Sequence, residues 1–242
     1  MMILVVGCGF VGETVAKSLE ENGTEVVRID PKLNDNKIHD YPKAKGAVVC
    51  VPTPTVNGRC DDSIIRTVLE ELRDTKVLLK CTVPPDMLAT YPDNVTYNPE
   101  FLRANTAKED WDRQKHFILG GSPQGCHFWR GVFSYLNVFF FDVDRATASM
   151  IKYVHNSWLA TKVAFFHEMK NNLDNSYNHD KMIDILGLFE NIGPSHMKAP
   201  NEDGGLGFGG HCFPKDTEAF YDYSKSEILK TVIEVNNKLR KE

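Results

Sequence analysis

The chain has 242 residues, of which 42% are hydrophobic and 25% are charged, the ordinary mixture of a globular protein and not that of a disordered chain, a collagen or a coiled coil. This length suffices for one large or two small domains, each with a buried core. The net charge of −5 does not indicate the basic surface that binds nucleic acid, so we exclude nucleic acid as a partner.

The sequence also indicates the compartment. No apolar run approaches the roughly 20 residues that span a bilayer, so we expect no membrane partner. The first residues, MMILVVGCGFVG, lack the basic segment of a signal peptide and predict a buried strand instead. The six cysteines form no CxxC pair, so we expect reduced thiols in a cytoplasmic protein.

The first part of the chain alternates between strand and helix signals. Residues 2–6 predict a strand buried on both faces; glycines follow, and then a helix to about Asn22, which Gly23 ends. Asp61 or Asp62 begins a second helix that runs to about Leu72. Further strand signals cover residues 25–29, 46–51, 76–80, 95–98, 117–119 and 138–142. This alternation predicts an α/β fold with a doubly wound, Rossmann-like, mostly parallel sheet.

The composition changes near residue 143. Residues 144–173 predict one long amphipathic helix, whose apolar face Lys162 interrupts. The apolar residues of this face are Ile151, Val154, Trp158, Phe165, Met169 and Leu173. A helical stretch at 180–187, a Gly/Pro-rich loop at 193–210 and a last helix from about 225 follow. We therefore divide the chain into a sheet domain, 1–143, and a smaller all-helical domain, 144–242, joined by a long connecting helix.

A glycine motif stands between the first strand and the first helix. Gly7, Gly9 and Gly12 form GxGxxG, in which the glycines allow a tight turn, a close backbone approach to pyrophosphate and helix–strand packing. Asp30 lies 18 residues beyond Gly12, where a carboxylate accepts ribose hydroxyls and repels a 2′-phosphate. The motif predicts NAD rather than NADP, although Arg28 and Lys32 beside Asp30 weaken that preference.

A second polar cluster covers residues 207–216. Cys212 and Asp216 lie one turn apart if a helix begins here, and a thiol becomes a nucleophile as thiolate, which a helix N-terminus or a cation favours. The alternative is a small buried residue, which we accept for the other five cysteines. Lys152 and Asn156 share one face of the long helix, where a solvated charged face is the simpler interpretation. No zinc-ligand spacing and no GxSxG elbow are present, so we expect no metal.

In order, these segments resemble the UDP-glucose/GDP-mannose dehydrogenase family. The matching segments are GCGFVG (7–12), CVPTP (50–54), CTVPP (81–85), NPEFLR (98–103), ILGG (118–121), KYVHNSWLATKVAFFHE (152–168), GFGGHCFPKD (207–216) and VIEVNN (232–237). The resemblance implies oxidation of the C6 alcohol of a nucleotide sugar to a carboxylate, with two NAD and a covalent cysteine intermediate. It shifts Lys152 and Asn156 from a bland surface pair to catalytic candidates.

The resemblance implies roles residue by residue. Cys212 matches the nucleophile, Lys152 the oxyanion-stabilising lysine, and Asn156 its neighbour. Asp216 matches the acid that helps to activate water, while Thr82 and Glu100 belong to the water and proton network. The implied cofactor contacts are Gly7, Gly9, Phe10, Val11, Gly12, Asp30, Val51, Pro52, Thr53, Thr82 and Lys215. The implied substrate contacts are Glu100, Phe101, Leu102, Lys152, Asn156, Phe208, Gly209 and Gly210.

The family also implies an assembly. Domain 1–143 becomes the NAD-binding domain, and 144–242 the central domain that carries the cysteine and forms a homodimer. We expect the apolar stripe of the last helix to form the dimer core, or else to pack within one chain. This stripe comprises Ile228, Leu229, Val232, Ile233, Val235 and Leu239.

The chain departs from the family pattern at several positions. The third domain, which grips the nucleotide in the family, is expected to be missing from these 242 residues. Ala104 and Asn105 replace an acidic residue, Asn191 replaces an arginine that reaches across the dimer to substrate, and His211 replaces a small residue before the cysteine. A longer loop follows Asn191.

Two other functions compete with sugar-nucleotide oxidation. One is a dehydrogenase of a smaller hydroxy substrate, of the β-hydroxyacid dehydrogenase type, in which no thiol is needed. The other is a non-catalytic NAD- or nucleotide-binding protein. The six matching polar positions favour the first function over both.

Overall fold

The computed structural model describes residues 1–56, 59–174, 176–201, 204–210 and 212–241. The chain separates into two compact units, Met1–Val56 with Cys60–Lys152 and Asn57–Arg59 with Tyr153–Glu242. The last sheet strand ends at Val143 and the long helix begins at Arg145, while the first turns of that helix cluster with the first unit. The functions that we assign to domains 1–143 and 144–242 stay predictions.

Seven strands of the described residues form one sheet in the first unit, in the order β2-β1-β3-β6-β7-β8-β9. Their bounds are β1 Met2–Val6, β2 Glu25–Ile29, β3 Gly46–Val49, β6 Lys76–Leu79, β7 Val95–Tyr97, β8 His116–Gly120 and β9 Phe139–Val143. The strand pairs are parallel except β7 with β8. The prediction of a doubly wound, mostly parallel sheet is confirmed.

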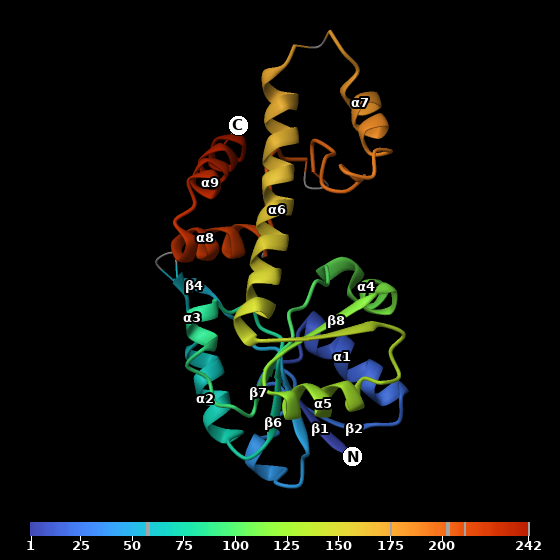
Figure 1. Ribbon diagram of the computed structural model, residues 1–242, viewed down its shortest axis with the longest axis vertical. Coiled ribbons are helices and arrows are strands. Elements are labelled where there is room, and N and C mark those ends of the chain that lie inside the picture. Colours follow the sequence, from blue (N-terminus) through green and yellow to red (C-terminus); the bar gives the residue numbers. More distant parts are fainter. Residues whose placement is uncertain (57–58, 175, 202–203, 211, 242) are drawn as a thin grey trace. The chain divides into compact units, whose positions relative to one another are not determined.

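Helices cover both faces of this sheet (Figure 1). The helices of the first unit are α1 Phe10–Glu21, α2 Ser63–Glu71, α3 Pro85–Leu88, α4 Ala107–Arg113 and α5 Pro123–Val132, with short 3₁₀ turns η1 Ile38–Asp40 and η2 Ala104–Thr106 and a small hairpin of β4 Thr55–Val56 and β5 Arg59–Cys60. Side chains of a strand alternate between faces. Accordingly, Leu4 and Val6 join the core under α2 and α3, while Ile3 and Val5 join the core under α1, α4 and α5.

The second part of the chain is helical, as expected. Its helices are α6 Arg145–Asn172, α7 His179–Leu186, α8 Phe213–Ser224 and α9 Glu227–Leu239. The last helix is predicted correctly, but α8 is a helix of its own that the sequence indicates only by the spacing of Cys212 and Asp216. Lys225 separates α8 from α9 because it adopts a left-handed conformation, with φ of 53°.

The apolar face of α6 is turned outward. Val154, Trp158 and Phe165 are 50%, 61% and 54% exposed. The buried face carries both apolar and polar residues. These are Tyr153, Ala160, Val163, Ala164 and Phe166, and Lys152, Asn156, Ser157 and His167. Lys162 does not interrupt an apolar face: it is buried, and its ammonium donates to the carbonyls of Ile192 (2.7 Å) and Gly193 (2.9 Å). Therefore α6 leaves an apolar stripe exposed in this single chain.

The stripe of α9 is largely covered within the chain. Leu229, Val232 and Leu239 are buried, and Val232 packs in one cluster with Phe208 and with alanines of α6. Ile228 alone of the stripe is 70% exposed. Packing within one chain therefore accounts for the buried part of the α9 stripe, and the dimer core stays a prediction. No helix of the described ranges is long and apolar enough to cross a membrane.

A substitution at Gly12 tests how tightly the Gly7–Gly12 turn is packed. A Cβ at Gly12 would lie 1.9 Å from the Gly7 carbonyl oxygen, whereas one at Gly131 in α5 would meet nothing within 4 Å. We expect Gly12→Ala to lower the free energy of unfolding by about 1–3 kcal/mol because of overpacking. Gly131→Ala is the control, which should leave stability unchanged or slightly higher. Urea unfolding followed by circular dichroism measures both, and equal stability of the two variants would contradict the prediction.

Candidate active site

The glycine turn is closed on one side and open on the other. Gly7 has a φ of +84°, and a Cβ there would lie 2.7 Å from the Cys50 carbonyl oxygen. A Cβ at Gly9 would meet nothing within 4 Å, and Gly9 caps α1 with no side-chain hydrogen bond. The backbone N–H groups at the start of α1 therefore remain available beside open space. This arrangement fits the pyrophosphate of a dinucleotide.

Asp30 follows β2 beside the same turn. Its Oδ2 accepts a hydrogen bond from the Cys8 N–H (2.7 Å) and its Oδ1 accepts one from the Lys32 N–H (2.9 Å). Two backbone donors thus fix the carboxylate, which keeps further acceptor capacity. A fixed carboxylate at the end of β2 is compatible with the expected ribose contact.

The other implied cofactor contacts follow neighbouring strands. Val51, Pro52 and Thr53 follow β3, which ends at Val49, and Thr82 follows β6, which ends at Leu79. The two strands run parallel to β1, so these segments leave the sheet at the edge where the glycine turn begins. Val51 and Thr53 are buried, and Pro52 is exposed. This is the edge at which open α/β sheets bind ligands.

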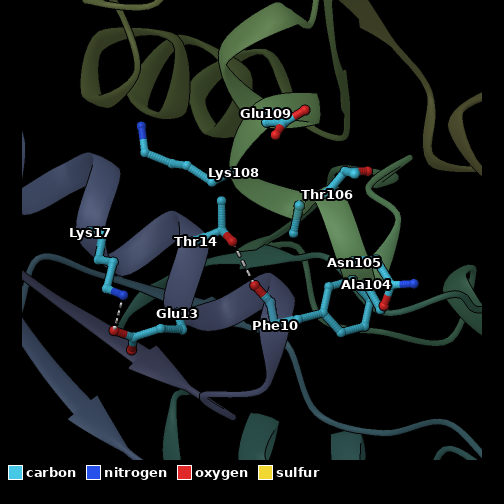
Figure 2. A pocket seen from close by; sticks show the side chains of 10 residues that line it. Phe10, Glu13, Thr14, Lys17, Ala104, Asn105, Thr106, Lys108 and Glu109 are labelled. Atoms are coloured by element: carbon cyan, nitrogen blue, oxygen red, sulfur yellow. Dashed lines mark hydrogen bonds and ion pairs between the residues drawn. The ribbon is translucent and has the colours of Figure 1, made fainter.

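A hollow of about 500 Å³ lies beside the glycine turn (Figure 2). It separates the outer side of α1 from the segment 104–109 and is lined by Phe10, Glu13, Thr14, Lys17, Ala104, Asn105, Thr106, Ala107, Lys108 and Glu109. Phe10, an implied cofactor contact, is 41% exposed. Ala104 and Asn105, which stand where an acidic residue was expected, line this hollow together with Phe10.

Lys152 and Glu100 form a buried pair. The Lys152 ammonium lies 3.7 Å from Glu100 Oε1, and their side chains are 4% and 9% exposed. The same ammonium donates to the Glu100 backbone carbonyl and lies 5.1 Å from the centre of the Phe101 ring. Glu100 Oε2 also accepts from the Leu102 N–H (2.8 Å). The structure thus brings together four residues that the resemblance implies for catalysis and substrate binding.

A buried lysine that the sequence reasoning missed holds the start of this segment. Lys80 is buried, and its ammonium donates to Asn98 Oδ1 (2.6 Å), whose amide donates to the Ile118 carbonyl (2.7 Å). The Lys80 ammonium also lies 5.4 Å from the centre of the Trp111 ring. Burial lowers the pKa of Lys80. The available signal was Asn98 itself, the first residue of NPEFLR.

Asp110 holds the other end of the segment. Its carboxylate accepts hydrogen bonds from the Arg103 backbone N–H (2.9 Å), from the Arg103 guanidinium (2.7 and 3.0 Å) and from the Thr106 hydroxyl (2.9 Å). These bonds, above all those from the guanidinium, lower the pKa of Asp110 to about 2. The segment that carries Glu100–Leu102 is therefore tied down at both ends.

Asp110→Asn tests this attachment. An Asp whose pKa is near 3.9 when unfolded and about 2 when folded contributes about 2 kcal/mol of stability at neutral pH. Because the folded pKa is depressed, that contribution is present above pH 4 and is lost as the pH falls toward 2. We expect the variant to be less stable by this amount at pH 7, and the difference to shrink between about pH 4 and pH 2. Denaturant titrations at several pH values measure it, and a pH-independent difference would refute the electrostatic cause.

The second unit holds a separate polar group around Asp216. Asp216 is 1% exposed; its Oδ2 accepts from the Asn156 amide (2.7 Å) and its Oδ1 lies 2.5 Å from the Lys215 ammonium. Cys212 is the N-cap of α8, and its carbonyl accepts from the Asp216 N–H (2.8 Å). The thiol thus belongs to the residue that begins a helix, where the macrodipole favours negative charge. Lys215, implied as a cofactor contact, binds Asp216 in this structure.

Polar side chains also hold the glycine-rich loop before Cys212. The Gly207 N–H donates to His167 Nδ1 (2.9 Å), and the Phe208 N–H donates to Asn236 Oδ1 (2.6 Å). His167 Nε2 lies 2.8 Å from the Lys198 carbonyl oxygen, which fixes the neutral tautomer with its proton on Nε2. Phe208 is buried, whereas Gly210 is exposed. The sequence reasoning missed these supports, although Asn236 lies in the motif VIEVNN.

Three further expectations concern single residues or metals. His211 lies outside the described residues. Asn191, which stands in place of the family's arginine, is exposed. Within the ranges that the structure describes, no group of three or more His, Cys, Asp or Glu side chains could hold a metal ion.

The sheet and the glycine turn define a Rossmann-like protein with a helical second part. Residues 146–238 match the model of the central domain of the UDP-glucose/GDP-mannose dehydrogenase family. The chain is 30% identical to UDP-glucose 6-dehydrogenase of Rickettsia felis, over 82% of this chain and 49% of that protein. It is 27% identical to UDP-glucose 6-dehydrogenase YwqF of Bacillus subtilis, over 98% of this chain and 66% of that protein.

Solved structures show the same fold. A UDP-glucose dehydrogenase from Pyrobaculum islandicum superposes with a TM-score of 0.81 at 24% identity, over 98% of this chain and 68% of that chain. The chain belongs to the UDP-glucose/GDP-mannose dehydrogenase family. It spans about half to two thirds of the length of the curated relatives it matches.

Proposed function

We propose that this chain acts as an NAD-dependent oxidoreductase, most like UDP-glucose 6-dehydrogenase, that converts the C6 alcohol of a UDP-glucose-type nucleotide sugar to the carboxylate. The observation that carries the proposal is the pair of buried polar contacts on α6. Lys152 meets Glu100, and Asn156 meets Asp216, at positions that match the family's reactive residues. Such pairs cost desolvation and are weak evidence for stability alone, so a chemical role explains them better.

The described residues fit NAD. Gly9 has open space where a Cβ would lie, and two backbone N–H groups fix the Asp30 carboxylate, which we assign to the ribose. We assign Gly7, Gly9, Phe10, Val11, Gly12, Asp30, Val51, Pro52, Thr53, Thr82 and Lys215 to cofactor binding. Bound NAD supplies the hydride acceptor for each of the two oxidation stages.

The remaining chemistry belongs to side chains. The Cys212 thiolate attacks the C6 aldehyde to give a thiohemiacetal, which oxidation converts to a thioester and water then hydrolyses, releasing the thiol. Overall, one alcohol, one water and two NAD⁺ give one carboxylate, two NADH and three protons. Lys152 stabilises the oxyanion, a contribution of roughly 3–4 kcal/mol for a typical donor. Asp216 with Asn156, and Thr82 with Glu100, hold and move protons and water.

Substrate contacts and assembly complete the proposal. Glu100, Phe101, Leu102, Lys152, Asn156, Phe208, Gly209 and Gly210 bind the sugar. A homodimer forms through the exposed apolar stripe of α6 rather than through α9, because α6 leaves Val154, Trp158 and Phe165 uncovered. Large apolar patches of this kind mark protein interfaces.

The number of NADH formed per sugar tests the reaction. With UDP-glucose, and in parallel with GDP-mannose, we expect two NADH for each sugar consumed by the 242-residue chain. One NADH per substrate molecule would support the alternative of a dehydrogenase that acts on a smaller hydroxy substrate. NAD binding without formation of NADH would support a non-catalytic protein. Both of these outcomes contradict the proposal.

Cys212→Ser isolates the thiol step. We expect this variant to lose acid formation, by at least about a hundredfold, because serine lacks an activated thiolate, while traces of aldehyde are released. Cys126→Ala is the matched control, since Cys126 is buried in the sheet core and should keep acid formation. Product analysis by mass spectrometry measures both, and full acid production by Cys212→Ser would exclude the covalent role.

The dimer prediction has its own matched control. We expect the chain to be dimeric, Trp158→Glu with Phe165→Glu to be monomeric, and Ile228→Glu to stay dimeric although Ile228 is 70% exposed. Charges placed at a buried apolar interface are costly, whereas the same charge on an uninvolved surface is not. Size-exclusion chromatography with light scattering decides; a monomeric native chain would contradict the prediction.

A further inference from the structure

Arg28 on β2 is held by two carboxylates of α1. Its Nε lies 2.8 Å from Glu13 Oε2, and its Nη1 and Nη2 lie 2.6 and 2.9 Å from the two carboxylate oxygens of Glu20. The Arg28 side chain is 22% exposed, and those of Glu13 and Glu20 are 34% and 40% exposed. All of these residues belong to the first unit. The guanidinium is therefore occupied on two sides.

Arg28 lies where a cation would change coenzyme choice. Arg28 lies near the end of β2, two residues before Asp30, which follows the last strand residue, Ile29. An arginine near this carboxylate position is what accommodates the 2′-phosphate in NADP sites. A free Arg28 would therefore counteract Asp30, as its position in the sequence suggests.

The charges around Arg28 cancel that attraction. The hydrogen bonds from Arg28 lower the pKa of Glu13 and of Glu20, so both stay ionised, and they raise the pKa of Arg28 itself. Lys17 lies 3.5 Å from Glu13 Oε1. Two cations and two carboxylates neutralise one another, so Arg28 no longer counteracts the Asp30 carboxylate.

We propose that Glu13 and Glu20 determine coenzyme specificity: by binding the Arg28 guanidinium they deny it to a 2′-phosphate, and so exclude 2′-phosphorylated dinucleotides. The inference rests on the proposed NAD site and goes beyond it, because it assigns the discrimination to residues of α1 that touch no cofactor group themselves. Their action is exerted through Arg28.

Binding of two probes to the whole chain tests this inference without any turnover. Isothermal titration compares ADP-ribose with ADP-ribose 2′-phosphate. We expect the native chain to bind ADP-ribose at least tenfold more tightly. In Glu13→Gln with Glu20→Gln, Arg28 is freed for charge-assisted hydrogen bonds, and the ratio should fall by about tenfold. Adding Arg28→Gln to that double variant should restore the native ratio.

A control separates this contact from a general change of charge. Glu21→Gln with Glu25→Gln also removes two negative charges, one from the end of α1 and one from the start of β2. Glu21 pairs with Lys108 at 3.6 Å, and Arg28 binds Glu13 and Glu20 instead. The control should keep the native ratio. Three results would each overturn the inference. The affinity ratio could fall in the control, it could stay unchanged in the Glu13→Gln, Glu20→Gln variant, or it could remain low after Arg28→Gln is added to that variant. Thermal unfolding of each variant verifies that it is folded.

Failure of the proposed function gives a different result. A chain that binds ADP-ribose with these ratios yet forms no NADH contradicts the proposed reaction and supports the inference. A native chain that binds neither probe contradicts the cofactor site and overturns the inference with it.

Discussion

The close approach of the Gly7–Gly12 turn to the end of β3 is the constraint on which the first unit depends. A side chain at Gly7 would collide with the Cys50 carbonyl, and one at Gly12 with the Gly7 carbonyl. Because no Cβ intervenes, α1 begins directly at the sheet edge, with its N–H groups toward open space. The same placement of α1 brings Asp30 to the Cys8 N–H and lines up Glu13 with Arg28. The cofactor site and the coenzyme choice that we propose thus both depend on one packing contact.

The buried and exposed faces of α6 carry different kinds of residue. A helix that packs against its own chain ordinarily buries apolar residues, and α6 does bury Tyr153, Val163 and Phe166. It also buries Lys152 and Asn156, however, and exposes Trp158 and Phe165. Burying a charge is unfavourable unless it is paired, and the pairing with Glu100 and Asp216 supplies the compensation. In our proposal the buried polar residues of α6 serve the chemistry, and its exposed apolar residues form the interface with another chain.

Much of the fold follows from local patterns, because buried parallel strands are short apolar runs and glycine turns have few alternatives. Residues 2–6 and 25–29 are such cases, and both strands occur as predicted. The faces of α6 and α9 were harder to predict, since periodicity finds a stripe but not what covers it. Arg28 shows the limit most clearly. Its position beside Asp30 suggests an attraction for a 2′-phosphate, but its partners are 8 and 15 residues away in the sequence, and only the folded chain reveals them.

The candidate reactive groups are preorganised within their own units. Glu100 is fixed by Lys152, while its segment is anchored by Asn98 on Lys80 and by Arg103 on Asp110. In the second unit, Asn156 fixes Asp216. The glycine-rich loop before Cys212 is held by hydrogen bonds to buried His167 of α6 and Asn236 of α9. Groups held by their neighbours need little reorganisation when charge develops during a reaction. Because each set is complete within one unit, a substitution such as Asp110→Asn loosens the first set while leaving the second intact, and this separates a positioning effect from loss of the fold.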